Sequence, residues 1–134
     1  MYTKRFLISF VAAFVLLMGM GFLVHGLWLA PDYGALPNVM RTQEDADAHF
    51  QFMILAHVFI AGAFVWMYGQ GRKDGDWMGQ GLRFGLAVSL VGAIPFFFIY
   101  HAVAQFPLDL AIKQSIGDTA AFLLAGLAVA HLNK

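Results

Sequence analysis

Long runs of apolar residues, separated by short polar segments, make up most of the chain. A bilayer has a hydrocarbon core of about 30 Å and offers no water to backbone N–H and C=O groups, so a span needs roughly 20 apolar residues in helical form. Four runs meet this requirement, over residues 6–30, 49–68, 82–104 and 108–132. The pattern predicts an all-α integral membrane protein, a four-helix antiparallel bundle forming one transmembrane domain over residues 1–134.

The fourth run is the least apolar, because Asp109, Lys113, Gln114 and Asp118 all fall in its first half. One central Asp opposes insertion by about 2.5 to 3.5 kcal/mol, whereas each Leu, Ile, Val or Phe favours it by only about 0.3 to 0.6 kcal/mol. These contributions nearly cancel over residues 108–132. We therefore expect Asp118 to have a polar partner on a neighbouring helix.

Composition supports a lipid environment and excludes several classes of protein. The chain is 60% hydrophobic and only 12% charged, against about 25% charged in soluble domains. Its net charge of zero provides no basic face for nucleic acid. The absence of cysteine excludes a disulfide scaffold, a thiolate metal site and a cysteine nucleophile.

The basic residues predict the orientation in the membrane. Two of them, Arg41 and Lys113, fall on one side of a four-span model. The other six fall on the opposite side and are Lys4, Arg5, Arg72, Lys73, Arg83 and Lys134. Because cytoplasmic loops are enriched in Lys and Arg, both termini are predicted to be cytoplasmic. The first run is too long for a signal peptide and has no A-x-A site, so we expect an uncleaved anchor.

The chain contains a faint internal duplication. Arg5-Phe6 opens the first run and Arg83-Phe84 opens the third. His25 and His101 follow, and each is followed six residues later by a proline. This pattern is consistent with two related helical hairpins, although basic and aromatic residues recur at membrane interfaces in any case.

Small residues recur every four positions in the last two runs, where they predict helix contact faces. They are Gly81, Gly85, Ser89 and Ala93 in the third run and Gly117, Ala121 and Ala125 in the fourth. These faces can close the bundle or dock it onto another protein. Pro95, inside the third run, predicts a kinked helix.

Ionisable groups inside spans are candidate sites by default. Counted from the outer side, His57 and Asp118 each lie roughly 12 to 14 Å into their helices. We therefore predict a hydrogen bond or ion pair between His57 and Asp118, with Gln114 on the same helix face as Asp118. The pair can act as a step in a proton relay or as a polar clasp that secures the fourth helix.

A second group of ionisable residues lies nearer the outer surface. Its members are His25, His49, His101, Asp45 and Asp109. Imidazole nitrogen and carboxylate oxygen are ligands for zinc or copper. Histidines at one depth on facing helices, His25 with His101 or His57 with His101, can also ligate haem. We expect no bound cofactor, with haem b and a divalent metal as the alternatives.

Three segments carry a family resemblance: Trp28-Leu29-Ala30-Pro31-Asp32-Tyr33, Met40-Arg41-Thr42 through His49-Phe50, and Gly81-Leu82-Arg83-Phe84-Gly85. Through them the chain resembles a group of small four-span bacterial inner-membrane proteins. The resemblance implies a cellular setting and carries over no catalytic residue. A looser similarity to four-helix b-type cytochromes is limited to architecture.

No nucleotide-binding glycine loop, serine nucleophile elbow or H-E-x-x-H zinc motif occurs in the chain. We therefore expect a protein that is not an enzyme but an accessory or scaffolding subunit of a larger membrane complex. Its expected partners are the lipid bilayer and other membrane subunits or a second copy, and no nucleic acid. The alternatives are a haem- or metal-binding redox protein that uses the outer histidines and a proton-linked transporter around His57 and Asp118.

Overall fold

The computed structural model describes residues 3–134, which are helical apart from short connections and contain no strand. The first span is formed by α1 (Thr3–Gly21) and a π-helical segment, η1 (Phe22–Trp28). The short helices α2 (Ala30–Gly34) and α3 (Gln43–Ala48) connect it to α4 (Phe50–Gly71). Next come α5 (Trp77–Val88), a second π-helical segment η2 (Ser89–Ala93), α6 (Ile94–Val103) and α7 (Leu108–Leu132).

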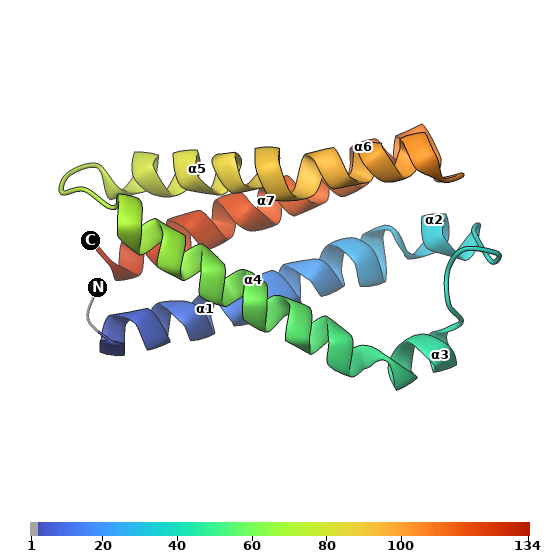
Figure 1. Ribbon diagram of the computed structural model, residues 1–134, viewed down its shortest axis with the longest axis horizontal. Coiled ribbons are helices and arrows are strands. Elements are labelled where there is room, and N and C mark those ends of the chain that lie inside the picture. Colours follow the sequence, from blue (N-terminus) through green and yellow to red (C-terminus); the bar gives the residue numbers. More distant parts are fainter. Residues whose placement is uncertain (1–2) are drawn as a thin grey trace.

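Four helical stretches are long and apolar enough to cross a membrane: Thr3–Trp28, Phe50–Gly71, Trp77–Val103 and Leu108–Leu132. Figure 1 shows both termini at one end of the molecule, hereafter the termini end, and α2 and α3 at the other, hereafter the α2–α3 end. The third stretch begins at Trp77, earlier than the predicted start at residue 82, because the Oδ1 of Asp76 accepts a hydrogen bond from the Gly79 N–H at 2.9 Å and caps the helix.

Helix α7 lies at the centre of the arrangement. It packs along α1, α5 and α6, whereas α4 packs mainly on α1 and contacts α7 only slightly. Within the most apolar part of each stretch, 39% of the α7 residues are buried, against 17 to 22% in the other three. The least apolar span is therefore the one most surrounded by protein, which keeps its polar residues away from lipid.

Glycines let α5 and α7 approach until their backbones touch. A Cβ at Gly85 would lie 2.8 Å from the carbonyl carbon of Phe122, and one at Gly81 would lie 2.6 Å from the carbonyl oxygen of Gly126. The other small residues of the predicted contact faces, Ser89, Ala93, Gly117, Ala121 and Ala125, are also buried. Because apolar burial gains little in lipid, this close approach is a main source of packing energy.

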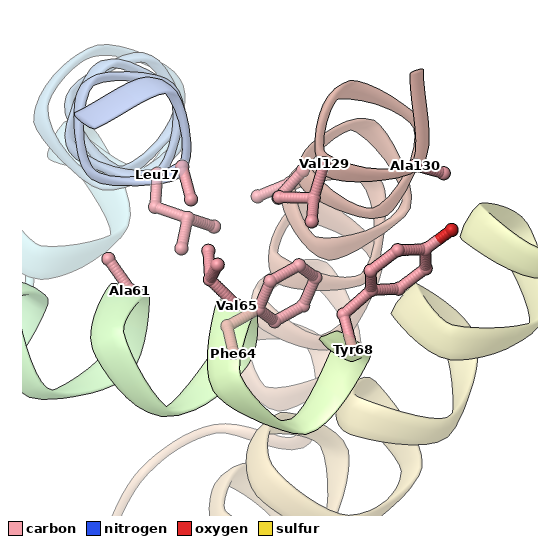
Figure 2. Close-up of a cluster of buried hydrophobic side chains, with 10 residues drawn as sticks. Leu17, Ala61, Phe64, Val65, Tyr68, Val129 and Ala130 are labelled. Carbon is pink, nitrogen blue, oxygen red and sulfur yellow. The ribbon is translucent and has the colours of Figure 1, made fainter. Parts of the chain in front are cut away.

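The main apolar core lies where α1, α4 and α7 meet (Figure 2). Leu17 comes from α1, Phe64 and Val65 from α4, and Val129 from α7. The Phe64 ring meets the Phe84 ring edge to face, with 4.7 Å between centroids, an arrangement that aromatic pairs prefer. In Figure 2 the hydroxyl of Tyr68 points away from this cluster, toward α5. This core therefore lies in the half of the molecule nearer the termini.

Each π-helical segment ends shortly before a proline. Segment η1 ends at Trp28 and is followed by Pro31, and η2 ends at Ala93 and is followed by Pro95. Proline has no N–H and its ring displaces the carbonyl four residues earlier, so the preceding turns widen. The kink predicted at Pro95 is thus a widened turn in the structure, and η1 is a second one that the sequence did not predict.

The two histidines of the suspected duplication have different surroundings. His25 is part of η1 and its ring hydrogen-bonds two other side chains. His101 is exposed on α6, and its Nδ1 donates to the backbone oxygen of Phe106 at 2.6 Å. The two sequence positions therefore share no local contact pattern.

Candidate functional site

Polar side chains from η1, α2 and α7 converge near the α2–α3 end. The Nε2 of His25 lies 2.7 Å from the Oδ1 of Asp118. The Nδ1 of His25 is hydrogen-bonded to the hydroxyl of Tyr33, which also accepts from the Nε2 of Gln114 at 3.1 Å. These four residues form a continuous chain of hydrogen bonds, hereafter the His25 network.

Local sequence explains how the His25 network is assembled. Pro31 lies in the first turn of α2 and starts a new short helix directly after η1. The chain changes direction there, so Tyr33 of α2 lies beside His25 of η1. Gln114 and Asp118 are four residues apart on α7 and therefore share a helix face. A small apolar cluster of Val24, Leu29 and Leu110 packs beside the network. This packing holds the end of the first span against α7.

One arrangement of protons satisfies the whole network. The Gln114 amide donates to the Tyr33 oxygen, the Tyr33 hydroxyl donates to Nδ1 of a neutral His25, and Nε2–H of His25 donates to the Asp118 carboxylate. A protonated His25 has two N–H donors, so Tyr33 would have to accept from it and from Gln114 while its own hydroxyl proton lost its partner. In the first arrangement the proton of the His25 ring lies on Nε2 and every hydrogen bond of the network has one donor and one acceptor.

An ion pair borders the network on the side of the α2–α3 end. The Nζ of Lys113 lies 2.9 Å from the Oδ1 of Asp32 and 3.8 Å from the Oδ2 of Asp109. Asp32 precedes Tyr33 on α2, and Lys113 precedes Gln114 on α7. Two successive residues of α2 thus contact two successive residues of α7, which fixes the position of α2.

Burial raises the pKa of the Tyr33 hydroxyl above its usual value of 10.0, and the nearby carboxylates of Asp118 and Asp32 raise it further against the opposing effect of the Gln114 hydrogen bond. Since the pKa is higher in the folded than in the unfolded protein, folding favours the neutral hydroxyl. The stability that depends on it is complete below about pH 10 and is lost as the pH rises through the folded-state pKa.

We expect Tyr33→Phe to lower the free energy of unfolding by about 1 kcal/mol at neutral pH, because two hydrogen bonds are lost from the network. The difference from the unmodified protein should shrink above pH 10, where ionised Tyr33 destabilises the native state. Unfolding in mixed detergent micelles at pH 7 to 11 measures both effects. A difference between the two proteins that stays constant over this range contradicts the assignment.

The predicted partner of Asp118 is wrong. Within residues 3–134 Asp118 pairs with His25, and the Nδ1 of His57 donates to the backbone oxygen of Met53 on its own helix at 2.8 Å. A histidine in a helix can donate a hydrogen bond to the carbonyl four residues earlier, so it needs no partner on another helix. The prediction did not include α2 and the widened turn of η1, which bring His25 to Asp118.

The proposed metal ligands do not come together: within residues 3–134 no three His, Asp or Glu side chains are close enough to hold a metal ion. His49 bonds the backbone oxygen of Asp45, whose carboxylate pairs with Arg41 at 2.8 Å. Asp109 lies beside Lys113. Both ring nitrogens of His25 are occupied by protein partners. The donor set therefore fits neither a divalent metal nor a haem axial ligand at His25.

Sequence reasoning missed Tyr33 and Asp32 as members of the site. Both lie beyond the end of the first apolar run, where an aromatic residue is ordinarily an interface anchor. Pro31 is the sequence feature that could have indicated them. It interrupts the helix just after the first apolar run, so Asp32 and Tyr33 can lie beside the end of that helix.

Comparison of the chain with protein-family models, with curated proteins and with solved structures gave no match.

Proposed function

We propose that this protein is a non-catalytic accessory or scaffolding subunit of a larger membrane complex. In this proposal its four helices cross a bacterial inner membrane as an antiparallel bundle, with both termini in the cytoplasm. The one-sided distribution of six basic residues supports that orientation. The His25 network then serves as a structural clasp that holds the outer end of the first span on α7.

The observation that carries the proposal is the uncovered half of α4 nearest α3. Between Phe50 and Ile60 every residue except His57 is exposed, whereas the other half of α4 contributes Phe64, Val65 and Tyr68 to the core. Figure 1 shows this exposed half diverging from α6. One lateral side of the molecule is therefore open, and a helix of another membrane protein could fill it.

Helices in lipid gain their packing energy from close contact with other helices. Contact with lipid alone therefore does not explain why the half of α4 over residues 50–60 stands apart from the other helices. The half of α4 nearer the termini packs on α5, where Phe64 and Tyr68 both meet Phe84, whereas the half over residues 50–60 is exposed apart from His57. A partner helix beside residues 50–60 would supply the contacts that this half of α4 lacks. The proposal thus assigns the α4 face to the partner and leaves the outward faces of η2 and α6 to lipid.

Site-specific photocrosslinking in native membranes tests the proposal. A photoreactive phenylalanine analogue at Phe59, which is 69% exposed on α4, should form a discrete protein adduct. The same analogue at Val91, which is 77% exposed on η2, is the matched control and should form none. The mass of the adduct identifies the partner, and twice 14.8 kDa indicates a second copy. No protein adduct at Phe59, or the same adducts at both positions, counts against the proposal.

A proton-linked activity is the second candidate, and the continuous hydrogen-bond chain from Gln114 to Asp118 favours it. Histidine titrates near physiological pH, and a carboxylate beside it can exchange a proton with it. Such an activity requires Asp118, so Asp118→Asn should abolish proton-dependent transport in proteoliposomes. Proton flux that does not differ between this variant, the unmodified protein and empty vesicles removes this candidate.

A further inference from the structure

Basic side chains at the termini end have no acidic partner. At the opposite end Arg41 and Lys113 each form an ion pair. No carboxylate oxygen lies within 4.0 Å of the other Lys and Arg side chains described in the structure, which are Lys4, Arg5, Arg72, Lys73, Arg83 and Lys134. The charges at the termini end are thus available to a ligand.

A pocket of about 420 Å³ lies at this end, between the last turn of α4 and the first turns of α5. Its polar lining includes Lys73, Asp74, Gln80 and Arg83, and its apolar lining includes Tyr68 and Phe84. The rings of Tyr68 and Phe84 meet edge to face, with 5.5 Å between centroids. The pocket therefore has a charged rim and an aromatic wall.

Hydrogen bonds hold the rim of the pocket in place. The side chain of Gln80 bonds the backbone of Lys73 twice, accepting from its N–H at 2.9 Å and donating to its carbonyl at 2.8 Å. The turn between them contains Gly75 with φ of 116°, a conformation that glycine adopts without strain. Asp76 caps α5 through the Gly79 N–H. A rim that is ordered before binding loses little entropy when a ligand arrives.

Arg83 extends from within the span back to this rim. It lies six residues after Trp77, about 9 Å further along the helix axis. Its Nη1 lies beside Gly79, 3.1 Å from the position that a Cβ there would occupy. Long basic side chains near helix ends reach toward the membrane interface in this way. The guanidinium therefore lies beside the first turn of α5, at the rim of the pocket.

The pocket presents both signs of charge without internal ion pairs. Asp76 is engaged in the helix cap, whereas Asp74 forms no hydrogen bond or ion pair with a side chain of the described chain. A purely anionic ligand would satisfy Lys73 and Arg83 but would be repelled by Asp74 and by Asp76, which also lines the pocket. A ligand with a phosphate and an N–H ammonium group pairs its phosphate with the two basic residues and its ammonium with Asp74.

We propose that this pocket binds the headgroup of an amine-bearing zwitterionic phospholipid. Lys73 and Arg83 hold the phosphodiester, Asp74 accepts hydrogen bonds from the primary ammonium, and the acyl chains pass along the wall formed by Tyr68 and Phe84. This site lies at the opposite end of the molecule from the His25 network and does not depend on the protein partner proposed for α4.

Native mass spectrometry of the full chain, released from micelles that contain equal amounts of two lipids, tests the proposal. Phosphatidylethanolamine and phosphatidylcholine with identical acyl chains differ only in whether the ammonium has N–H donors, and the unmodified protein should retain the former preferentially. Arg83→Gln should reduce this lipid adduct about tenfold, the effect of losing one charge-assisted hydrogen bond. Arg5→Gln removes a basic residue outside the pocket and should leave the adduct unchanged.

Asp74→Asn separates the ammonium contact from the phosphate contact. It should bring the two lipids to equal retention while the phosphate contact persists, and Lys73→Gln should weaken both. Equal retention of the two lipids by the unmodified protein overturns the proposal and requires no variant. Stronger retention of phosphatidylglycerol indicates a general basic surface and also overturns it. Equal competition by soluble phosphoethanolamine indicates a site for a free phosphate compound and overturns the lipid assignment.

Discussion

Gly85→Ala is expected to destabilise the protein by about 2 to 4 kcal/mol, because the added methyl group meets backbone atoms that cannot rotate away. The new Cβ would lie 2.8 Å from the carbonyl carbon of Phe122 and 2.9 Å from the Cα of Leu123. Helices α5 and α7 must separate to admit it, and the close contact between them is lost along its length. Detergent-induced unfolding followed by circular dichroism measures the change.

Gly92→Ala is the matched control for this experiment. A Cβ at Gly92 meets no atom within 4 Å, so this substitution should be neutral or stabilise the protein by a few tenths of a kcal/mol through the unfolded state. If the two variants unfold alike, close backbone approach between α5 and α7 does not hold the structure together.

The second large effect concerns Asp118, whose replacement by Ala should cost about 1.5 to 3 kcal/mol through the lost hydrogen bond with His25. A double-mutant cycle assigns the partner. His25→Ala combined with Asp118→Ala should give a coupling energy of about 1 to 2 kcal/mol. The cycle of His57→Ala with Asp118→Ala should be additive within about 0.5 kcal/mol, because these side chains are not bonded to each other.

The two coupling energies show whether His25 or His57 is the partner of Asp118. The positions of the two histidines along their helices do not distinguish them. Coupling between His57 and Asp118 that matches or exceeds the coupling of His25 would mean that α2 does not hold the first span on α7 as the structure shows. Unfolding in mixed micelles at one fixed pH serves both cycles.

The two ends of the molecule differ in how their charges are used. At the α2–α3 end Lys113 is paired with Asp32, and this pair and the His25 network bind α2 to α7. At the termini end Lys73 and Arg83 are unpaired around an open pocket. Under the proposals above, the first end serves to hold the chain together and the second to contact lipid.

Four apolar runs were recognisable because a span has a minimum length and must bury its backbone polar groups in a helix. The need for a polar partner at Asp118 was also recognisable, because a lone carboxylate in hydrocarbon is costly. The identity of this partner was not, since His25 and His57 both lie in the halves of their helices nearer the α2–α3 end (Figure 1). The choice between them depends on Tyr33 of α2, which lies beyond the end of the first apolar run.

The amino-acid sequence by itself determined that the chain is helical, that four of its segments suit a bilayer and that Asp118 needs a partner, because these properties follow from local composition and helix geometry. Only the tertiary structure decided that α7 is central, that Tyr33 joins His25 to Gln114 and that Lys73, Asp74 and Arg83 line one pocket. These contacts join residues that are distant in sequence or lie on either side of a turn. They depend on how closely the helices approach and where a proline widens a turn, and hydrophobicity alone specifies neither.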